Sequence, residues 1–85
     1  METQNVRYFL VLCDELNFTR AAQKCGIKQP TLTAAIRRME RKLGGALFLR
    51  KARPPYVQPT ALALRLYPIC VQMNKLMKKA SDLIR

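Results

Sequence analysis

The feature that most constrains the fold is the segment NFTRAAQKCGIKQPTLTAAIRRME (residues 17–40), because it holds two helical patterns separated by a single tight turn. The first pattern covers residues 18–24, and Gly26 follows it, where a residue without a side chain adopts the left-handed conformation at no steric cost. Pro30 then favours the start of a second helix, which ends near Leu43, before two glycines. Two helices joined in this way predict a helix-turn-helix.

The flanking segments predict a winged form of this motif. A helical face covers residues 3–16, and two short strands are expected within 47–58, on either side of two prolines. A long helical pattern follows. We therefore predict a mainly α fold, a winged helix-turn-helix of three helices plus a two-stranded β wing, followed by a long C-terminal linker or dimerisation helix. The expected domains are 1–59, the winged helix-turn-helix, and 60–85, the linker and dimerisation helix.

The third helix has two distinct faces when it is wound at 100° per residue. The inward stripe is apolar and consists of Leu32, Ile36, Met39 and Leu43. The outward face and its flanks carry Pro30, Thr31, Thr33, Ala34, Arg37, Arg38 and Arg41. Small residues at the N-terminal end and cations at the C-terminal end are typical of a recognition helix, whose first residues approach base edges while its cations lie along phosphates. The alternatives are plain surface hydroxyls for the two threonines and a helix cap for Gln29.

The charge balance supports an anionic partner. The 85 residues contain 16 Lys and Arg against 5 Asp and Glu, a formal net charge of +11. Eight of these cations lie between Lys28 and Arg53, where Glu40 is the only acid. Such a block favours nucleic acid, an anionic membrane surface or an acidic protein as partner.

The residue types needed for catalysis or metal binding are missing. The chain contains no His, and its three glycines form no phosphate-binding loop, so we expect no enzyme activity, no metal and no cofactor. Its three cysteines are an odd number and predict buried or half-buried thiols in a reducing cytoplasm. No signal peptide is evident, and no apolar run approaches the ~18 residues of a membrane span. We therefore expect a cytoplasmic protein.

The C-terminal pattern predicts a homodimer. Apolar residues alternate at spacings of four and three, at Leu62, Leu66, Ile69, Met73, Leu76, Ala80 and Leu83. This spacing is typical of a two-stranded helical seam. A helix of about 26 residues would be ~39 Å long and could separate two DNA-reading heads. The alternative is a monomeric helix that folds back on its own core.

Six short motifs occur in a specific order: VRYF, NFTRAA, KQPTLT, IRRME, LG and LFLR. Over about residues 5–60 the chain thereby resembles the DNA-binding domain of LysR-type transcriptional regulators. The resemblance implies a bacterial, cytoplasmic, nucleoid-associated transcription factor that binds an interrupted palindromic operator in double-stranded DNA. It also implies a homodimer, or a tetramer in a longer protein. The effector-binding domain of that family is absent here, so we expect the chain to be the DNA-binding part of a longer protein.

The resemblance also implies roles for individual residues. It places in the major groove Gln29, Pro30, Thr31 and Thr33. The phosphate contacts would come from Thr19 and from Arg37 or Arg38. The wing, about 47–58, would reach the backbone or the minor groove through Arg50 and Arg53. Ala34 departs from the family, which usually has Arg or a long polar residue there, and its methyl group can make only an apolar contact with a base.

Two other functions remain open from the residues alone. One is non-specific, architectural DNA binding, and the other is a cationic module whose long helix pairs with a protein or lies on an anionic membrane. The strict four–three spacing argues against the membrane, which favours a broader apolar face.

Overall fold

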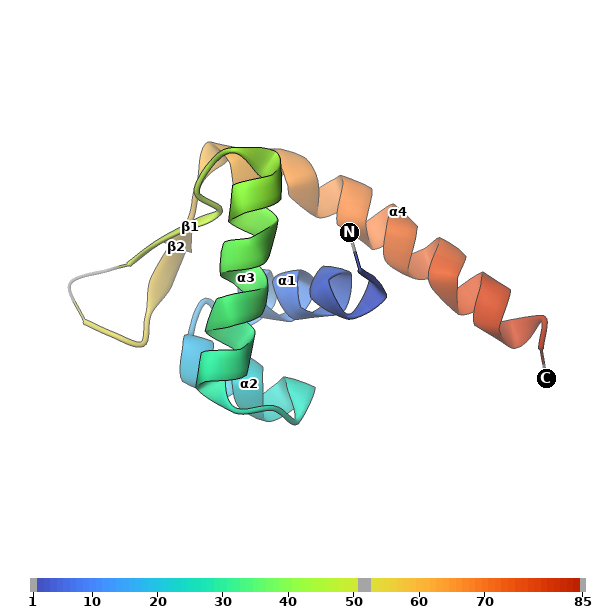
Figure 1. Ribbon diagram of the computed structural model, residues 1–85, viewed down its shortest axis with the longest axis horizontal. Coiled ribbons are helices and arrows are strands. Elements are labelled where there is room, and N and C mark those ends of the chain that lie inside the picture. The colour runs from blue at the N-terminus through green and yellow to red at the C-terminus, as the bar shows by residue number, and fades with distance from the viewer. Residues whose placement is uncertain (1, 51–52, 85) are drawn as a thin grey trace.

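The computed structural model describes residues 2–50 and 53–84, and its elements follow the predicted order. Three helices come first, α1 (Thr3–Glu15), α2 (Phe18–Cys25) and α3 (Gln29–Leu43). They are followed by strands β1 (Phe48–Arg50) and β2 (Val57–Pro59) and by helix α4 (Ala61–Asp82). The wing lies beside α3 at one end of the molecule, and α4 extends past α1 toward the other end (Figure 1). The predicted winged helix-turn-helix with a long C-terminal helix is therefore confirmed.

Local signals fix where α2 and α3 begin. The Asn17 side chain accepts a hydrogen bond from the Arg20 N–H at 3.0 Å, so Asn17 caps α2. Helix α3 begins after Lys28 without a side-chain cap and has Pro30 in its first turn, where a missing N–H does no harm.

The turn between α2 and α3 is as tight as the sequence predicts. Gly26 adopts the left-handed conformation with φ of 69°, and the Ile27 N–H donates to the Ala22 carbonyl at 3.0 Å. Ala21 and Ala22 are buried, and their small side chains allow α2 to pack closely on the rest of the core. These features hold α3 at a fixed angle to α2.

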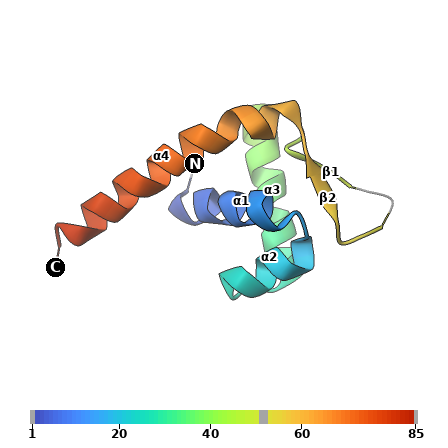
Figure 2. The ribbon, with the colours of Figure 1, turned by 180° about the vertical axis from the view of Figure 1, so that it is seen from behind.

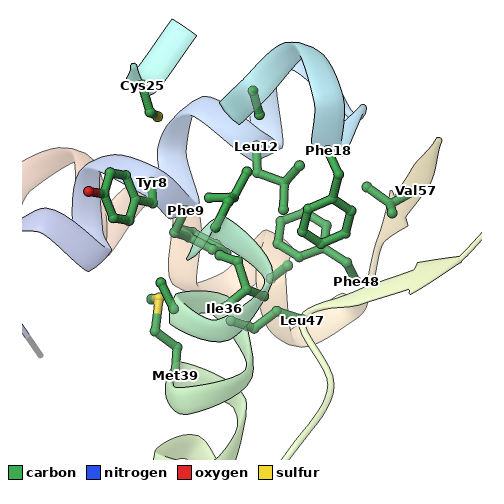
Figure 3. Packing of buried hydrophobic residues seen from close by; sticks show 14 of the residues in the cluster. Tyr8, Phe9, Leu12, Phe18, Cys25, Ile36, Met39, Leu47, Phe48 and Val57 are labelled. Atoms are coloured by element: carbon green, nitrogen blue, oxygen red, sulfur yellow. The ribbon is translucent and has the colours of Figure 1, made fainter. Parts of the chain in front are cut away.

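The core joins the helices to the wing (Figure 3). Phe9 of α1 is fully buried, and its ring centroid lies 5.8 Å from that of Phe48 in β1. The inward residues of α3 that are buried as predicted are Leu32, Ile36 and Met39. Leu43 was also predicted to face inward, and this was wrong, because its side chain is 39% exposed. The C-terminal end of α3 extends beyond α1 toward the start of α4 (Figure 1).

The wing is tied to the helices by main-chain hydrogen bonds. Strand β1 pairs antiparallel with β2, with Arg50 opposite Val57. The Phe18 N–H donates to the Pro55 carbonyl at 3.0 Å, and the Val57 N–H donates to the Leu16 carbonyl at 3.1 Å. A two-stranded ribbon is marginally stable alone, so these bonds to the α1–α2 junction help to define its position.

Helix α4 packs along α1 with one face (Figure 2). On this face Ala63, Leu66 and Cys70 are buried, and the Tyr67 hydroxyl donates to Asp14 Oδ1 at 3.0 Å. None of the described helices, α4 included, has the length and apolar character needed to cross a lipid bilayer.

The predicted seam on α4 divides between a buried and an exposed part. Leu66 is buried, and Leu62 and Met73 pack partly against the same core. The members that remain exposed are Ile69, Leu76, Ala80 and Leu83. The assignment of Leu66 to a surface that faces a partner is therefore corrected, because α1 covers that side of the helix. The exposed members form the outer row of α4.

The three thiols lie inside the molecule, as predicted. Cys25 and Cys70 are buried and Cys13 is half-buried. Burial disfavours the thiolate and raises the pKa of all three groups, that of Cys13 to about 12 with the nearby Asp14 carboxylate as a further cause.

Candidate nucleic-acid interface

A groove lies between the outward face of α3 and strand β1, and we call it the α3–wing groove. It is lined by Gln29, Pro30, Thr33, Ala34, Arg37, Arg38, Arg41 and Arg50. All of these except Arg41 are residues that the sequence predicted to contact DNA. The fold thus brings the predicted recognition helix and one predicted wing residue to a single surface.

The α3–wing groove is strongly electropositive. Four of its lining side chains are arginines, and none of the described residues that line it is acidic. The nearest acid in the sequence, Glu40, instead accepts a hydrogen bond from the Leu47 N–H at 2.7 Å, at the base of the wing. Guanidinium groups concentrated along one groove raise the local positive potential and match the bidentate geometry of phosphate oxygens.

Arg50 is held by an aromatic side chain. Its guanidinium carbon lies 5.8 Å from the centroid of the Phe18 ring, at the start of α2. Cation–π contacts of this kind contribute about 0.5–1 kcal/mol at exposed sites. The contact directs Arg50 from β1 toward α2 and α3. Sequence reasoning missed it, although alternation along a strand would have placed Arg50 on the same face as the buried Phe48.

The N-terminal half of α3 contributes small and neutral groups to the groove. Gln29 is exposed, and because no side chain caps α3, its amide is not a helix cap. Thr33 is half-buried, and Ala34 is exposed between the polar N-terminal residues and the arginines. Amide and hydroxyl groups can donate to and accept from base edges, whereas the methyl group of Ala34 cannot.

Three predicted contact residues lie outside the α3–wing groove. Thr19 is exposed in the first turn of α2, Thr31 is exposed on α3, and Arg53 is exposed in the loop between the strands. Arg41 was predicted to lie on the outward face of this helix but was not among the residues assigned a DNA contact; it lines the groove one helical turn after Arg37.

Comparison with known proteins identifies similar sequences over most of the chain. Residues 3–64 match the family described as bacterial regulatory helix-turn-helix proteins of the lysR family. The small neutral protease regulatory protein of Streptomyces coelicolor is 35% identical over 83 residues, which cover 94% of this chain and 25% of that protein. The transcriptional regulator BenM of Acinetobacter baylyi is 36% identical over 74 residues, which cover 87% of this chain and 24% of that protein. The chain thus spans about a quarter of the length of these relatives.

Solved structures have the same fold. The DNA-binding domain of CbnR in a complex with DNA superposes with a TM-score of 0.90 at 25% identity, covering 100% of this chain and 95% of that one. The DNA-binding domain of BenM in a complex with benA site 1 DNA gives a TM-score of 0.86 at 31% identity, covering 99% of this chain and 95% of that one.

Proposed function

The chain belongs to the lysR family of bacterial regulatory helix-turn-helix proteins, and we propose that it is the sequence-specific, double-stranded-DNA-binding part of a transcriptional regulator. The α3–wing groove carries this proposal, because it combines four arginines with an amide, a hydroxyl and a methyl group on one helix and one strand. The domains of BenM and CbnR, which share this fold, were solved in complexes with DNA. The relatives named above are regulators, in agreement with the expectation that the chain is not an enzyme.

In this proposal α3 enters the major groove. Its exposed N-terminal residues would face base edges, and its arginines would lie along the phosphates. The wing would lie against the backbone or the minor groove through Arg50 and Arg53. Thr19, exposed at the start of α2, would approach a phosphate beside them.

A homodimer through α4 would present two such heads to an interrupted palindromic operator. The support is the outer row of α4, where Ile69 is 54% exposed and Leu76 is 65% exposed. Large apolar side chains in one exposed row are typical of an interaction surface. In a longer protein the same chain would be part of a dimer or a tetramer, located in the bacterial cytoplasm on the nucleoid.

The direct test is selection of bound sequences from a random DNA pool, followed by competition between the selected operator and random DNA. Sequence-specific binding predicts an enriched motif and competition by the operator at much lower concentration than by random DNA. Equal competition by both would contradict the proposal and would favour non-specific architectural binding. Binding to anionic vesicles but not to DNA would favour the cationic interaction module.

Salt dependence identifies which arginines contact phosphate. We expect Arg37→Ala, Arg38→Ala and Arg50→Ala each to reduce the slope of log K against log salt by about one unit, because each phosphate contact releases about one counterion. The matched control is Lys78→Ala, which removes one charge from the C-terminal part of α4. The assignment fails for any arginine whose removal leaves the slope at the wild-type value.

Ala34 is expected to limit what α3 can read at the centre of its exposed face. Ala34→Arg should raise affinity for all DNA through added charge and create a new preference for guanine, worth about 1–3 kcal/mol for a good bidentate pair. Selected-site profiles of the two proteins measure this. Ser81→Arg adds the same charge near the end of α4 and should leave the profile unchanged. Identical profiles for Ala34→Arg and wild type would show that residue 34 does not face a base.

A further inference from the structure

Glu40 joins α3 to the base of the wing. Its Oε2 accepts a hydrogen bond from the Leu47 N–H at 2.7 Å and a longer one from the Phe48 N–H at 3.5 Å. Hydrogen bonds to a carboxylate are about twice as strong as those between neutral groups. Within residues 2–50 and 53–84, these are the hydrogen bonds that side chains of α3 make to the wing.

Hydrogen bonds from two sides hold the base of β1. On its other side, the Thr60 hydroxyl donates to the Ala46 carbonyl at 2.7 Å, and the Thr60 N–H donates to the Leu47 carbonyl at 2.9 Å. The base of β1 is thus held between α3 and the start of α4. Because the ribbon has three residues in each strand and is marginal alone, its orientation relative to α3 depends on these tethers, on the main-chain bonds to the α1–α2 junction and on the packing of Phe48 against Phe9.

Arg50 lies at the end of the strand that Glu40 holds. Both residues, with Arg37 and Phe48, line one hollow between α3 and the wing. A shift at Leu47 and Phe48 would therefore move β1, and with it the Arg50 guanidinium relative to the α3–wing groove.

We propose that Glu40 is a positioning residue for DNA binding, whose carboxylate orients the wing against α3 and so holds Arg50 in the α3–wing groove. This inference rests on the proposed function. Charge alone makes the opposite prediction, because an acid beside arginines weakens their attraction for phosphate. A substitution that keeps the charge of Glu40 but breaks its hydrogen bond to the Leu47 N–H therefore isolates the positioning role.

Two substitutions distinguish the effect of the length of the Glu40 side chain from the effect of its charge. Glu40→Asp keeps the charge but shortens the side chain by one methylene, so the bond to the Leu47 N–H is lost. Glu40→Gln removes the charge but keeps an acceptor oxygen at the same reach. We expect Glu40→Asp to bind the selected operator roughly three- to tenfold more weakly than wild type and Glu40→Gln to bind at least as tightly. Wild-type affinity for Glu40→Asp would overturn the proposal.

A double-mutant cycle with Arg50→Ala tests whether Glu40 acts through Arg50. If it does, Arg50→Ala should weaken binding by a smaller factor in Glu40→Asp than in wild type. Equal factors in the two backgrounds would overturn the proposal, because independent residues contribute additively. If Glu40 contributed only to overall stability, the folded variants would not show this coupling between Glu40 and Arg50.

Folding and the proposed function are checked separately. Thermal denaturation followed by circular dichroism defines a temperature at which all variants are folded, and affinities are compared there. Faster amide exchange at Leu47 and Phe48 in Glu40→Asp, but not in Glu40→Gln, is expected, and unchanged exchange in Glu40→Asp would also overturn the inference. A wild type that does not prefer the selected operator over random DNA would contradict sequence-specific binding. If the wild type prefers the operator but the effects of Glu40→Asp and Arg50→Ala on binding are additive, only the role of Glu40 is contradicted.

Discussion

Leu76→Asp is expected to convert the proposed α4 dimer into monomers and to weaken binding to a two-half-site operator by about two to four orders of magnitude. Leu76 is 65% exposed on the outer row of α4, where a second copy would cover it. A carboxylate buried without a partner in an apolar seam is strongly unfavourable, so the dimer would dissociate. Each DNA-binding domain would then bind its half-site alone, and the gain in affinity from a linked second domain on the other half-site would be lost. Sedimentation velocity and DNA titration measure the two effects.

The control for this substitution is Leu64→Asp. Leu64 is 63% exposed and lies on the same helix, but it is twelve residues before Leu76, so at about 100° per residue the two side chains point about 120° apart. The control makes the same chemical change at similar exposure and should leave the dimer intact. Binding to a single half-site should be nearly equal for both variants. A wild type that is monomeric at high micromolar concentration would exclude the α4 dimer.

Phe9→Ala is expected to lower the free energy of unfolding by about 3–5 kcal/mol. Phe9 is fully buried and contacts the ring of Phe48, so its removal leaves a cavity between α1 and the wing. Small domains have a total stability of about 5–15 kcal/mol, so this loss is a large part of it. DNA binding should decrease at temperatures where the wild type is fully folded. Urea denaturation followed by circular dichroism provides the measurement.

Leu64→Ala is the matched apolar truncation at an exposed position. Substitutions on exposed surface usually change stability by about 0.5 kcal/mol or less, so its unfolding curve should nearly overlay that of the wild type. An equal loss for the two variants would show that the core is not centred on α1 and the wing.

The order and type of the elements could be predicted because local chemistry decides them. Gly26 requires a turn, Pro30 favours a helix start, and the spacing of Leu32, Ile36 and Met39 fixes which side of α3 is buried. The prediction that these residues face inward was wrong only at Leu43. Periodicity shows which side of a helix is apolar but not where the neighbouring helix ends.

The candidate site was predictable only as far as it depends on a single helix. Seven of the groove-lining residues were named from the sequence, six of them on α3, where helical spacing relates them to one another. The contact of Arg50 with Phe18 and the hydrogen bonds of Glu40 join segments whose meeting depends on the packing of the wing. The division of α4 between its own core and an outer row depends likewise on where α1 lies.

The enclosed thiols have a practical consequence for labelling chemistry. Alkylating reagents and peroxides react with the thiolate, and a thiol with a pKa of about 12, as at Cys13, is almost entirely protonated near neutral pH. Cys25 and Cys70 are buried, and their pKa values are raised in the same direction. A cysteine introduced on an exposed surface would therefore react in preference to all three, so a fluorophore could be attached at one chosen position of the native protein without removal of its own cysteines.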